Sequence, residues 1–355
     1  MTNKIEEYFQ EVIDLHQWIF ENPEISGEEF ETSKRIVEFL KDKGYEVEYP
    51  FAGEPTGFKA TNGNKRKHQV ALLLEYDALP DIGHACGHSL SACISILAAL
   101  TLQDYQDELN TDIHLIGTPT EETVGAKVDM VHEGVFDDYD FSMMVHLDNK
   151  NRTKVKLQAL DSTCYIFKGQ AAHASAAPWE GKNAFNGAQL MFHALDMLRQ
   201  HMKPGCQIHG IIRHGGEAPN VVPEKVSLEL YSRAYTRDTL DELNHLIDDC
   251  ARGAAIATQT NWEKTPTANG FDNLRPNKKA EEILGEIFEE LGLENQEDPN
   301  EIFGSSDAGN VSNICPTLHP TLKIVEDGVP IHTRAFAEAV GSPRAHASLR
   351  TGALM

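Results

Sequence analysis

Two short polar segments contain residue types that could hold a metal ion and activate a water molecule. The first contains Asp77, Cys86 and His88, and the second ends in two adjacent carboxylates, Glu121 and Glu122. Cysteine, histidine and carboxylate side chains are the usual ligands of zinc in proteins. In a pair of glutamates, one carboxylate can bind the metal while its neighbour accepts a proton from the metal-bound water. The pattern therefore predicts a metal-dependent hydrolase.

The elements around these segments indicate how the polar residues come together. Three apolar runs are typical of strands buried on both faces, namely residues 70–74, 113–116 and 141–145. A helix is expected over residues 90–102, and strands that alternate with helices predict an α/β domain with a largely parallel sheet. Ligands gather beyond the carboxyl ends of such strands, so Asp77, the glutamate pair and His146 are expected at one edge.

Each residue also has a plainer interpretation when it is taken alone. A single cysteine is usually a small buried thiol, a histidine is often a hydrogen-bonded strand-end residue, and paired glutamates usually form a solvated surface. The convergence on successive strand ends favours the metal site. A purely structural zinc site would need a closed Cys/His set with short spacing, and the sequence contains no such set.

Length, charge and cysteine content limit the class of protein. The 355 residues suffice for two domains, and the net charge of −24 argues against binding to nucleic acid or to an anionic membrane surface. No apolar run reaches the ~20 residues of a membrane helix, and the start has no apolar segment of a signal peptide. The six cysteines are scattered, which predicts reduced thiols in a cytoplasmic protein.

The middle of the chain has a different pattern, which predicts an inserted domain. The expected order is strand, helix, strand, strand, helix, strand, at residues 163–168, 184–198, 207–213, 225–233, 240–251 and 255–262. This β-α-β-β-α-β order is ferredoxin-like. We therefore expect a catalytic domain of residues 1–160 and 269–355, interrupted by an insert of residues 161–268. A helix over residues 279–293 and a strand near 322–325 are expected to belong to the catalytic domain again.

The two ends of the catalytic domain allow further predictions. The first fifty residues predict two helices, and residues 26–29, Ser-Gly-Glu-Glu, fit a capping box that opens the second one. Residues 341–355 show no amphipathic period and contain Pro343, which would interrupt a helix. We expect this tail to be poorly ordered and to leave apolar surface of the domain uncovered.

The motifs resemble those of one metallopeptidase family. Residues 75–80, Glu-Tyr-Asp-Ala-Leu-Pro, and residues 84–88, His-Ala-Cys-Gly-His, resemble peptidase family M20, the aminoacylase/carboxypeptidase family. The likeness extends from about residue 10 to about residue 342. It is greatest to the amidohydrolase branch, in particular to p-aminobenzoyl-glutamate hydrolases and dipeptidases that act on basic dipeptides. The resemblance implies a mixed, largely parallel catalytic domain with a ferredoxin-like lid.

The resemblance also implies a centre of two divalent metal ions, zinc or manganese. The implied ligands are Cys86, His88, Glu122, His146 and His332. Cys86 matches the position of a ligand that bridges the two ions. Glu121 matches the catalytic base, and Asp77 matches a residue that orients a metal-bound histidine.

Further residues of the expected insert and of a later loop resemble groups that contact the substrate. His173 resembles a lid histidine that stabilises the oxyanion, although a turn histidine is the plainer interpretation. Asn220 could hydrogen-bond the substrate, and Arg233 could bind a substrate carboxylate with its planar fork, with Arg213 as a weaker candidate. Asp307 lies in a polar loop that either lines the cleft or is a solvated turn. The resemblance implies a homodimer formed through the lid domain.

These features together predict an amidohydrolase. Its substrate would be an N-acyl amino acid, p-aminobenzoyl-glutamate or a small dipeptide, and the acidic composition favours a basic leaving group. The alternative is an inactive metal-binding homologue that acts as a regulatory dimer. Glu121 favours the enzyme, because a protein without activity has no need of the base.

Overall fold

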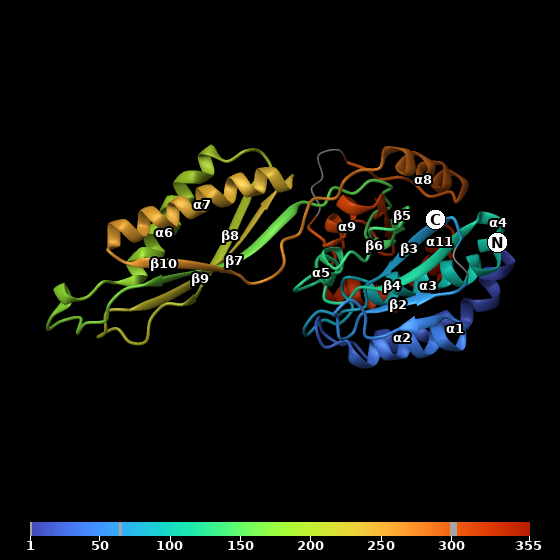
Figure 1. Cartoon of the computed structure of the whole chain (residues 1–355), viewed down its shortest axis with the longest axis horizontal. Helices are drawn as coiled ribbons and strands as arrows, with labels where there is room; N and C mark the ends of the chain where they lie inside the picture. The colour runs from blue at the N-terminus through green and yellow to red at the C-terminus, as the bar shows by residue number, and fades with distance from the viewer. Residues whose placement is uncertain (1, 64–65, 299–303) are drawn as a thin grey trace. The chain divides into compact units, whose positions relative to one another are not determined.

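The computed structural model describes residues 2–63, 66–298 and 304–355, which form two compact units (Figure 1). Unit 1 comprises the chain up to Lys156 and from Leu274 onward, and unit 2 comprises Leu157–Asn273. The insert expected at residues 161–268 falls within unit 2. Within the described part of the chain, no helix has both the length and the apolar character needed to cross a membrane.

Unit 1 is built on a six-stranded, largely parallel sheet, as the sequence predicts. Its order is β1-β2-β4-β3-β5-β11. The strands are β1 (Glu46–Glu48), β2 (Phe58–Thr61), β3 (His68–Leu74), β4 (Thr111–Gly117), β5 (Phe141–Met143) and β11 (Thr317–Leu318). The pairs β3–β4, β3–β5 and β5–β11 are parallel, whereas β1–β2 and β2–β4 are antiparallel. A separate parallel pair joins β6 (His146–Asp148) to β12 (Thr321–Lys323).

Helices cover both faces of this sheet, which explains the continuous apolar run of β3. On β3, Leu74 belongs to the core beneath α1 (Thr2–Glu21), α2 (Phe30–Asp42) and α3 (His88–Leu102). Ala71 and Leu73 belong to the opposite core, beneath α5 (Ala126–His132) and α9 (Ala308–Ile314). A strand with apolar contacts on both faces has no solvated side at which polar residues could alternate. A short helix, α4 (Gln106–Leu109), precedes β4.

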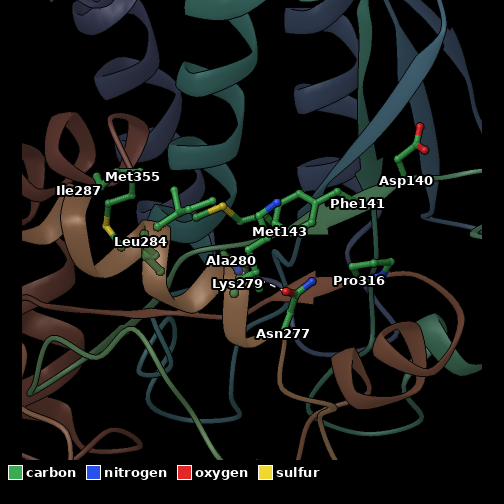
Figure 2. A pocket seen from close by; sticks show the side chains of 12 residues that line it. Asp140, Phe141, Met143, Asn277, Lys279, Ala280, Leu284, Ile287, Pro316 and Met355 are labelled. Carbon is green, nitrogen blue, oxygen red and sulfur yellow. Dashed lines mark hydrogen bonds between the residues drawn. The ribbon is translucent and has the colours of Figure 1, made fainter.

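A further helix, α8 (Lys278–Glu290), packs at the β11 edge of the sheet, where Leu284 and Phe288 are buried against Leu318. A mostly apolar groove of about 400 Å³ opens beside this helix (Figure 2). Its lining includes Phe141, Met143 and Met355, and none of the predicted metal ligands. The groove is therefore separate from the candidate site.

Unit 2 has the predicted β-α-β-β-α-β order. Its antiparallel sheet has the strand order β10-β7-β9-β8. The elements are β7 (Ala159–Lys168), α6 (Ala184–Leu198), β8 (Gln207–His214), β9 (Lys225–Ala234), α7 (Arg237–Thr258) and β10 (Asn261–Pro266). The two helices share a core with alternate residues of β9, Val226, Leu228 and Leu230.

The strand predicted at residues 255–262 begins too early. α7 continues to Thr258, because Ala254 and Ala255 are buried and extend the apolar stripe of Ile247 and Ala251. Alanine is also the residue with the highest helix propensity. The helix ends where Gln259 adopts a left-handed φ of 56°.

The predicted capping box is wrong. α2 begins at Phe30, and the Oγ of Ser26 instead lies 2.7 Å from the Oγ1 of Thr123. The start of the helix is capped by Glu24, whose carboxylate accepts hydrogen bonds from the amides of Glu31 and Thr32 at 3.1 and 2.6 Å. A spacing pattern cannot exclude a cap that comes from further back in the chain.

The expectation of a poorly ordered tail is also wrong. Residues after the predicted ligand His332 form two helices, α10 (Arg334–Val340) and α11 (Pro343–Ala353). Ser342 accepts a hydrogen bond from the amide of Ala345, and Pro343 occupies the first turn, where no amide donor is required. Ala345 and Leu349 are fully buried in the core that includes α3.

Candidate metal centre

The predicted metal ligands of unit 1 lie at strand and helix ends. Asp77 follows β3, the Glu121–Glu122 pair follows β4, and His146 begins β6. Cys86 precedes α3 by two residues, and His88 is the first residue of that helix. Gly87 between them has a φ of 89°, and a Cβ at this position would lie 2.8 Å from Leu147. Only glycine allows this approach, which brings Cys86 and His88 against β6.

Two groups of potential ligands share Cys86. The first is Cys86, His88 and His146, and the second is Cys86, Glu122 and His332. Within each group, one ligand atom from every residue lies within 4.8 Å of the others. The Sγ of Cys86 is 3.6 Å from the Nε2 of His146 and 3.4 Å from the Nε2 of His332. Tetrahedral zinc ligands with bonds of about 2.0–2.3 Å lie roughly 3.3–3.8 Å apart, so these separations suit ligand pairs.

Unpartnered buried atoms also fit a cation at this position. Among the described residues, the Nε2 of His88 and the Oε1 of Glu122 are buried and form no hydrogen bond, although the Oε2 of Glu75 lies 3.2 Å from the first atom and the Nε2 of His332 lies 3.5 Å from the second. Buried polar atoms are normally satisfied, and exceptions are costly unless an ion or water completes them. The donor set of thiol, imidazole and carboxylate is that of a zinc or mixed-ligand divalent site.

Neighbouring groups fix the orientation of two of these histidines. The Nδ1 of His88 lies 3.0 Å from the Oδ1 of Asp77 and 3.1 Å from its carbonyl oxygen. The Nδ1 of His146 is 2.8 Å from the carbonyl oxygen of Leu147. Both Nδ1 atoms face acceptors and therefore carry the proton, which leaves each Nε2 lone pair available for a metal. Asp77 also accepts a hydrogen bond from the amide of Glu122 at 2.9 Å.

The two adjacent glutamates have opposite electrostatic environments. Burial and the negative charges of Glu75 and Glu122 raise the pKa of Glu121 well above its ordinary value. Burial also opposes the ionisation of Glu122, but the neighbouring imidazole of His332 and the charge of His88 lower its pKa to about 2. Carboxylates whose pKa values are separated in this way are suited to different roles. Glu121 suits proton transfer, and Glu122 suits permanent coordination of a cation.

Comparisons with known proteins agree with this geometry. Residues 151–258 match the model of the peptidase dimerisation domain of the M20 family. The chain is 35% identical to the Xaa-Arg dipeptidase of Mus musculus, over 99% of this chain and 85% of that protein. The chain belongs to the M20 peptidase family.

Two further proteins are similar to the chain. It is 30% identical to one of the subunits of the p-aminobenzoyl-glutamate hydrolase of Escherichia coli, over 82% of this chain and 65% of that protein. Among solved structures, it resembles a dinuclear metal-binding peptidase of the M20 family from Bacillus subtilis, with a TM-score of 0.69 and 18% identity. That match covers 98% of each chain. The fold class predicted from the sequence, a largely parallel α/β domain with a ferredoxin-like insert, is confirmed.

Sequence reasoning did not predict a buried lysine beside the candidate centre of this M20 protein. Lys127 on α5 is fully buried, with its Nζ 2.5 Å from the Oε1 of Glu75 and 2.6 Å from the Oδ1 of Asp307. The other oxygen of Glu75 is 3.2 Å from the Nε2 of His88. Against its burial, the charge of Lys127 lowers the pKa of Glu75 to about 2. The signal in the sequence was a carboxylate, Glu75, directly after the apolar run of residues 70–74.

Asp307 was predicted to bind substrate, but its carboxylate faces the interior. The side chain is fully buried, and its second oxygen accepts a hydrogen bond from the amide of Lys127 at 3.0 Å. Asp307 therefore forms an ion pair with Lys127 and does not line an open cleft.

Like Lys127, His319 was not predicted from the sequence. Its ring stacks on that of His146 at a centroid distance of 5.4 Å.

Unit 2 places its predicted residues in two different regions. His173 and Asn220 are exposed and lie on neighbouring segments, where the amide of Ala174 bonds the carbonyl of Asn220 at 3.0 Å. Asn220 precedes β9, and Arg233 is the second-last residue of that strand. A strand extends about 3.3 Å per residue, so most of the length of β9 separates the two residues. The guanidinium of Arg213 is engaged with Glu229 at 2.5 Å.

Proposed function

We propose that this M20 protein is a metal-dependent amidohydrolase that cleaves a small dipeptide or an N-acyl amino acid. The observation that carries the proposal is the pair of ligand groups that share Cys86, with Glu121 beside them. One ion would be held by Cys86, His88 and His146. The other would be held by Cys86, Glu122 and His332.

The chemistry divides between the metals and the side chains of the chain. Divalent ions held by these residues would supply Lewis acidity for a water molecule and for the amide carbonyl. Glu121, whose pKa is raised by burial, would accept a proton from the water as its oxygen adds to the carbonyl carbon, and would return that proton to the nitrogen as the carbon–nitrogen bond breaks. The Oε2 of Glu121 lies 3.9 Å from the Nε2 of His88, so the base is close to one ligand group.

We also propose roles in the reaction for three residues of unit 2. His173 would stabilise the oxyanion, Asn220 would hydrogen-bond the substrate, and Arg233 would bind its carboxylate. The match of residues 151–258 to a dimerisation domain supports a homodimer formed through this unit. The ions would be zinc, which suits cysteine and histidine, or manganese, which suits carboxylates. Six free cysteines support a cytoplasmic location.

We infer that the preferred substrate is a dipeptide with a basic carboxy-terminal residue. The 35% identity with an Xaa-Arg dipeptidase over nearly the whole chain supports this class. The net charge of −24 also favours a cationic substrate over an anionic one. N-acyl amino acids and p-aminobenzoyl-glutamate are the competing substrates.

A substrate panel tests the proposal. The purified protein, loaded with zinc or manganese, is assayed for amine release from Xaa-Arg and Xaa-Lys dipeptides, N-acyl amino acids and p-aminobenzoyl-glutamate. We expect the highest kcat/KM for a basic dipeptide, loss of activity with a chelator and recovery with added metal. A metal-loaded protein that cleaves nothing in the panel would favour the inactive, metal-binding homologue instead.

A further inference from the structure

The segment between α1 and α2 contacts the turn that carries the two glutamates of the candidate centre. Glu29, in this segment, is fully buried. Its Oε1 accepts hydrogen bonds from the amides of Gly27 at 2.8 Å and of Thr120 at 3.1 Å. Its Oε2 accepts a hydrogen bond from the Oγ1 of Thr56 at 3.2 Å. A buried carboxylate is costly unless it is hydrogen-bonded, and these hydrogen bonds, one of which comes from Thr120, meet that requirement.

The partner of Glu29, Thr120, has an unfavourable backbone conformation. Its φ is 62°, in the left-handed region that β-branched residues rarely adopt. Such a conformation is unfavourable and persists only when its surroundings hold it. The carbonyl of Thr120 accepts hydrogen bonds from the amides of Thr123 and Gly125, and its Oγ1 accepts one from the amide of Ala126.

The strained residue immediately precedes the carboxylate pair. The chain reverses at Thr120, and Glu121 and Glu122 follow it directly. The amide of Thr120 is held by Glu29, and the amide of Glu122 is held by Asp77 at 2.9 Å. Two different buried carboxylates therefore hold the peptide groups 119–120 and 121–122, which lie on either side of the peptide group that joins Thr120 to Glu121.

We propose that Glu29 is a positioning residue that directs Glu121 and Glu122 toward the metal centre by holding Thr120 in its left-handed conformation. This inference rests on the proposed function, in which Glu121 is the base and Glu122 is a ligand. A shift of about 1 Å in a catalytic group can cost about 10²-fold in rate, so a hydrogen bond one residue away from the base is sufficient to control it.

Glu24 provides a matched control in the same segment. Its carboxylate accepts hydrogen bonds from the amides of Glu31 and Thr32 at the start of α2, whereas the carboxylate of Glu29 accepts one from the amide of Thr120. Glu29→Ala and Glu24→Ala each remove one carboxylate from this segment, but only the first releases the turn. Glu29→Gln is the rescue variant, because its side-chain carbonyl oxygen can still accept the hydrogen bond of Thr120.

The experiment compares kcat, KM, bound metal per chain and melting temperature for the wild type and the three variants. We expect Glu29→Ala to lower kcat by roughly 10²-fold with a small change in KM, and to reduce metal content. Glu29→Gln should recover most of the kcat and the full metal content. Glu24→Ala should lower the melting temperature and leave kcat and metal content unchanged.

The outcomes separate the two proposals. If the wild-type protein neither binds metal nor cleaves any substrate, the proposed function is wrong, and the proposed role of Glu29 is wrong with it. Active wild type together with a Glu29→Ala variant that loses only stability, as Glu24→Ala does, overturns the inference and leaves the function intact. Equal losses in Glu29→Gln and Glu29→Ala would also overturn it. If Glu29→Ala does not fold, Glu29→Asp decides, because its shorter side chain cannot reach Thr120 and must lower kcat.

Discussion

Two adjacent glutamates acquire different properties because their neighbours differ. Burial disfavours the ionised form of Glu121, and the nearby carboxylates of Glu75 and Asp307 add to this effect. Glu122 lies against the ring of His332, with 3.5 Å between Oε1 and Nε2, so its ionised form is favoured. The sequence assigns the same residue type to both positions, and only the fold distinguishes them.

Replacing Glu121 with glutamine should abolish proton transfer without removing a ligand. We expect kcat to fall by at least ~10²-fold, the usual range for loss of a general base, while metal content remains that of the wild type. Assays of metal-loaded protein and elemental analysis of the same preparation check this. Glu122→Gln is the matched control and should lose metal. A Glu121→Gln protein that remains active with full metal content would show that another group is the base.

The shared position of Cys86 makes a stoichiometric prediction. His146→Ala and His332→Ala should each weaken one ligand group and retain close to one metal ion per chain. Cys86→Ala belongs to both groups and should weaken the binding of both ions. Metal per chain, measured after dialysis against a fixed metal concentration, distinguishes these cases. Equal metal content in all three variants would mean that Cys86 does not bridge.

The polar residues of the candidate centre differ in how far the sequence could predict them. Cys86, His88, Glu122 and His146 lie in short motifs or beside predicted strands, whereas His332 could be named only through the resemblance to the family. The ion pair of Lys127 with Glu75 could not be predicted, because the partners are 52 residues apart and only the packing of α5 on the sheet joins them. Asp307 looked like a loop residue because the sequence does not reveal which loops turn inward.

At the scale of elements, the long buried strands and helices were predictable and the helix ends were not. The apolar runs of β3 and β4 require burial on both faces and so define the sheet. The start of α2 depends on Glu24, and the end of α7 depends on one left-handed residue, Gln259. Both features arise from single side-chain or backbone contacts that periodicity does not contain.

The tail was misjudged because its apolar face is made of small residues. α11 approaches α3 closely, and a Cβ on Gly352 would lie 2.7 Å from the Cδ1 of Ile94. Alanine, serine and glycine on this face allow close helix packing but give a weak amphipathic pattern. Leu349 is the large residue that is fully buried there.

Substitutions on this face should therefore destabilise unit 1. We expect Leu349→Ala to lower the free energy of unfolding by about 2–5 kcal/mol, and Gly352→Ala by about 1–3 kcal/mol through overpacking. Arg344→Ala, at a half-exposed side chain of the same helix, is the control and should change it by less than about 0.5 kcal/mol. Urea unfolding measures all three. Wild-type stability in both core variants would mean that α11 contributes little to the fold.

At the scale of the whole molecule, segments from distant parts of the chain meet in unit 1. α1 and α11 pack together, where the ring of His16 lies 5.5 Å from that of His346, and Arg350 forms an ion pair with Glu6. His16 is fully buried, and neither of its ring nitrogens has a hydrogen-bond partner among the described residues. A third histidine, His84, contributes to the same environment, and its Nε2 lies 3.2 Å from the carbonyl oxygen of Ile19.

The burial of His16 beside two other histidines predicts a loss of stability in acid. Burial, with smaller contributions from His346 and His84, lowers the pKa of His16 to about 3 from an ordinary value near 6.5. Between these values the unfolded chain binds the proton and the folded protein does not. The stability associated with His16 is therefore complete above about pH 6.5 and is lost as the pH falls toward 3, with a slope of up to about 1.4 kcal/mol per pH unit.

His16→Leu removes this proton linkage while keeping an apolar side chain in the core, so its unfolding free energy should fall less steeply between pH 6 and pH 4 than that of the wild type. Carboxylates protonate equally in both proteins, so the difference between the two slopes isolates the histidine. Parallel pH profiles for His16→Leu and wild type would show that His16 is already protonated, or exposed to water, when unit 1 is folded.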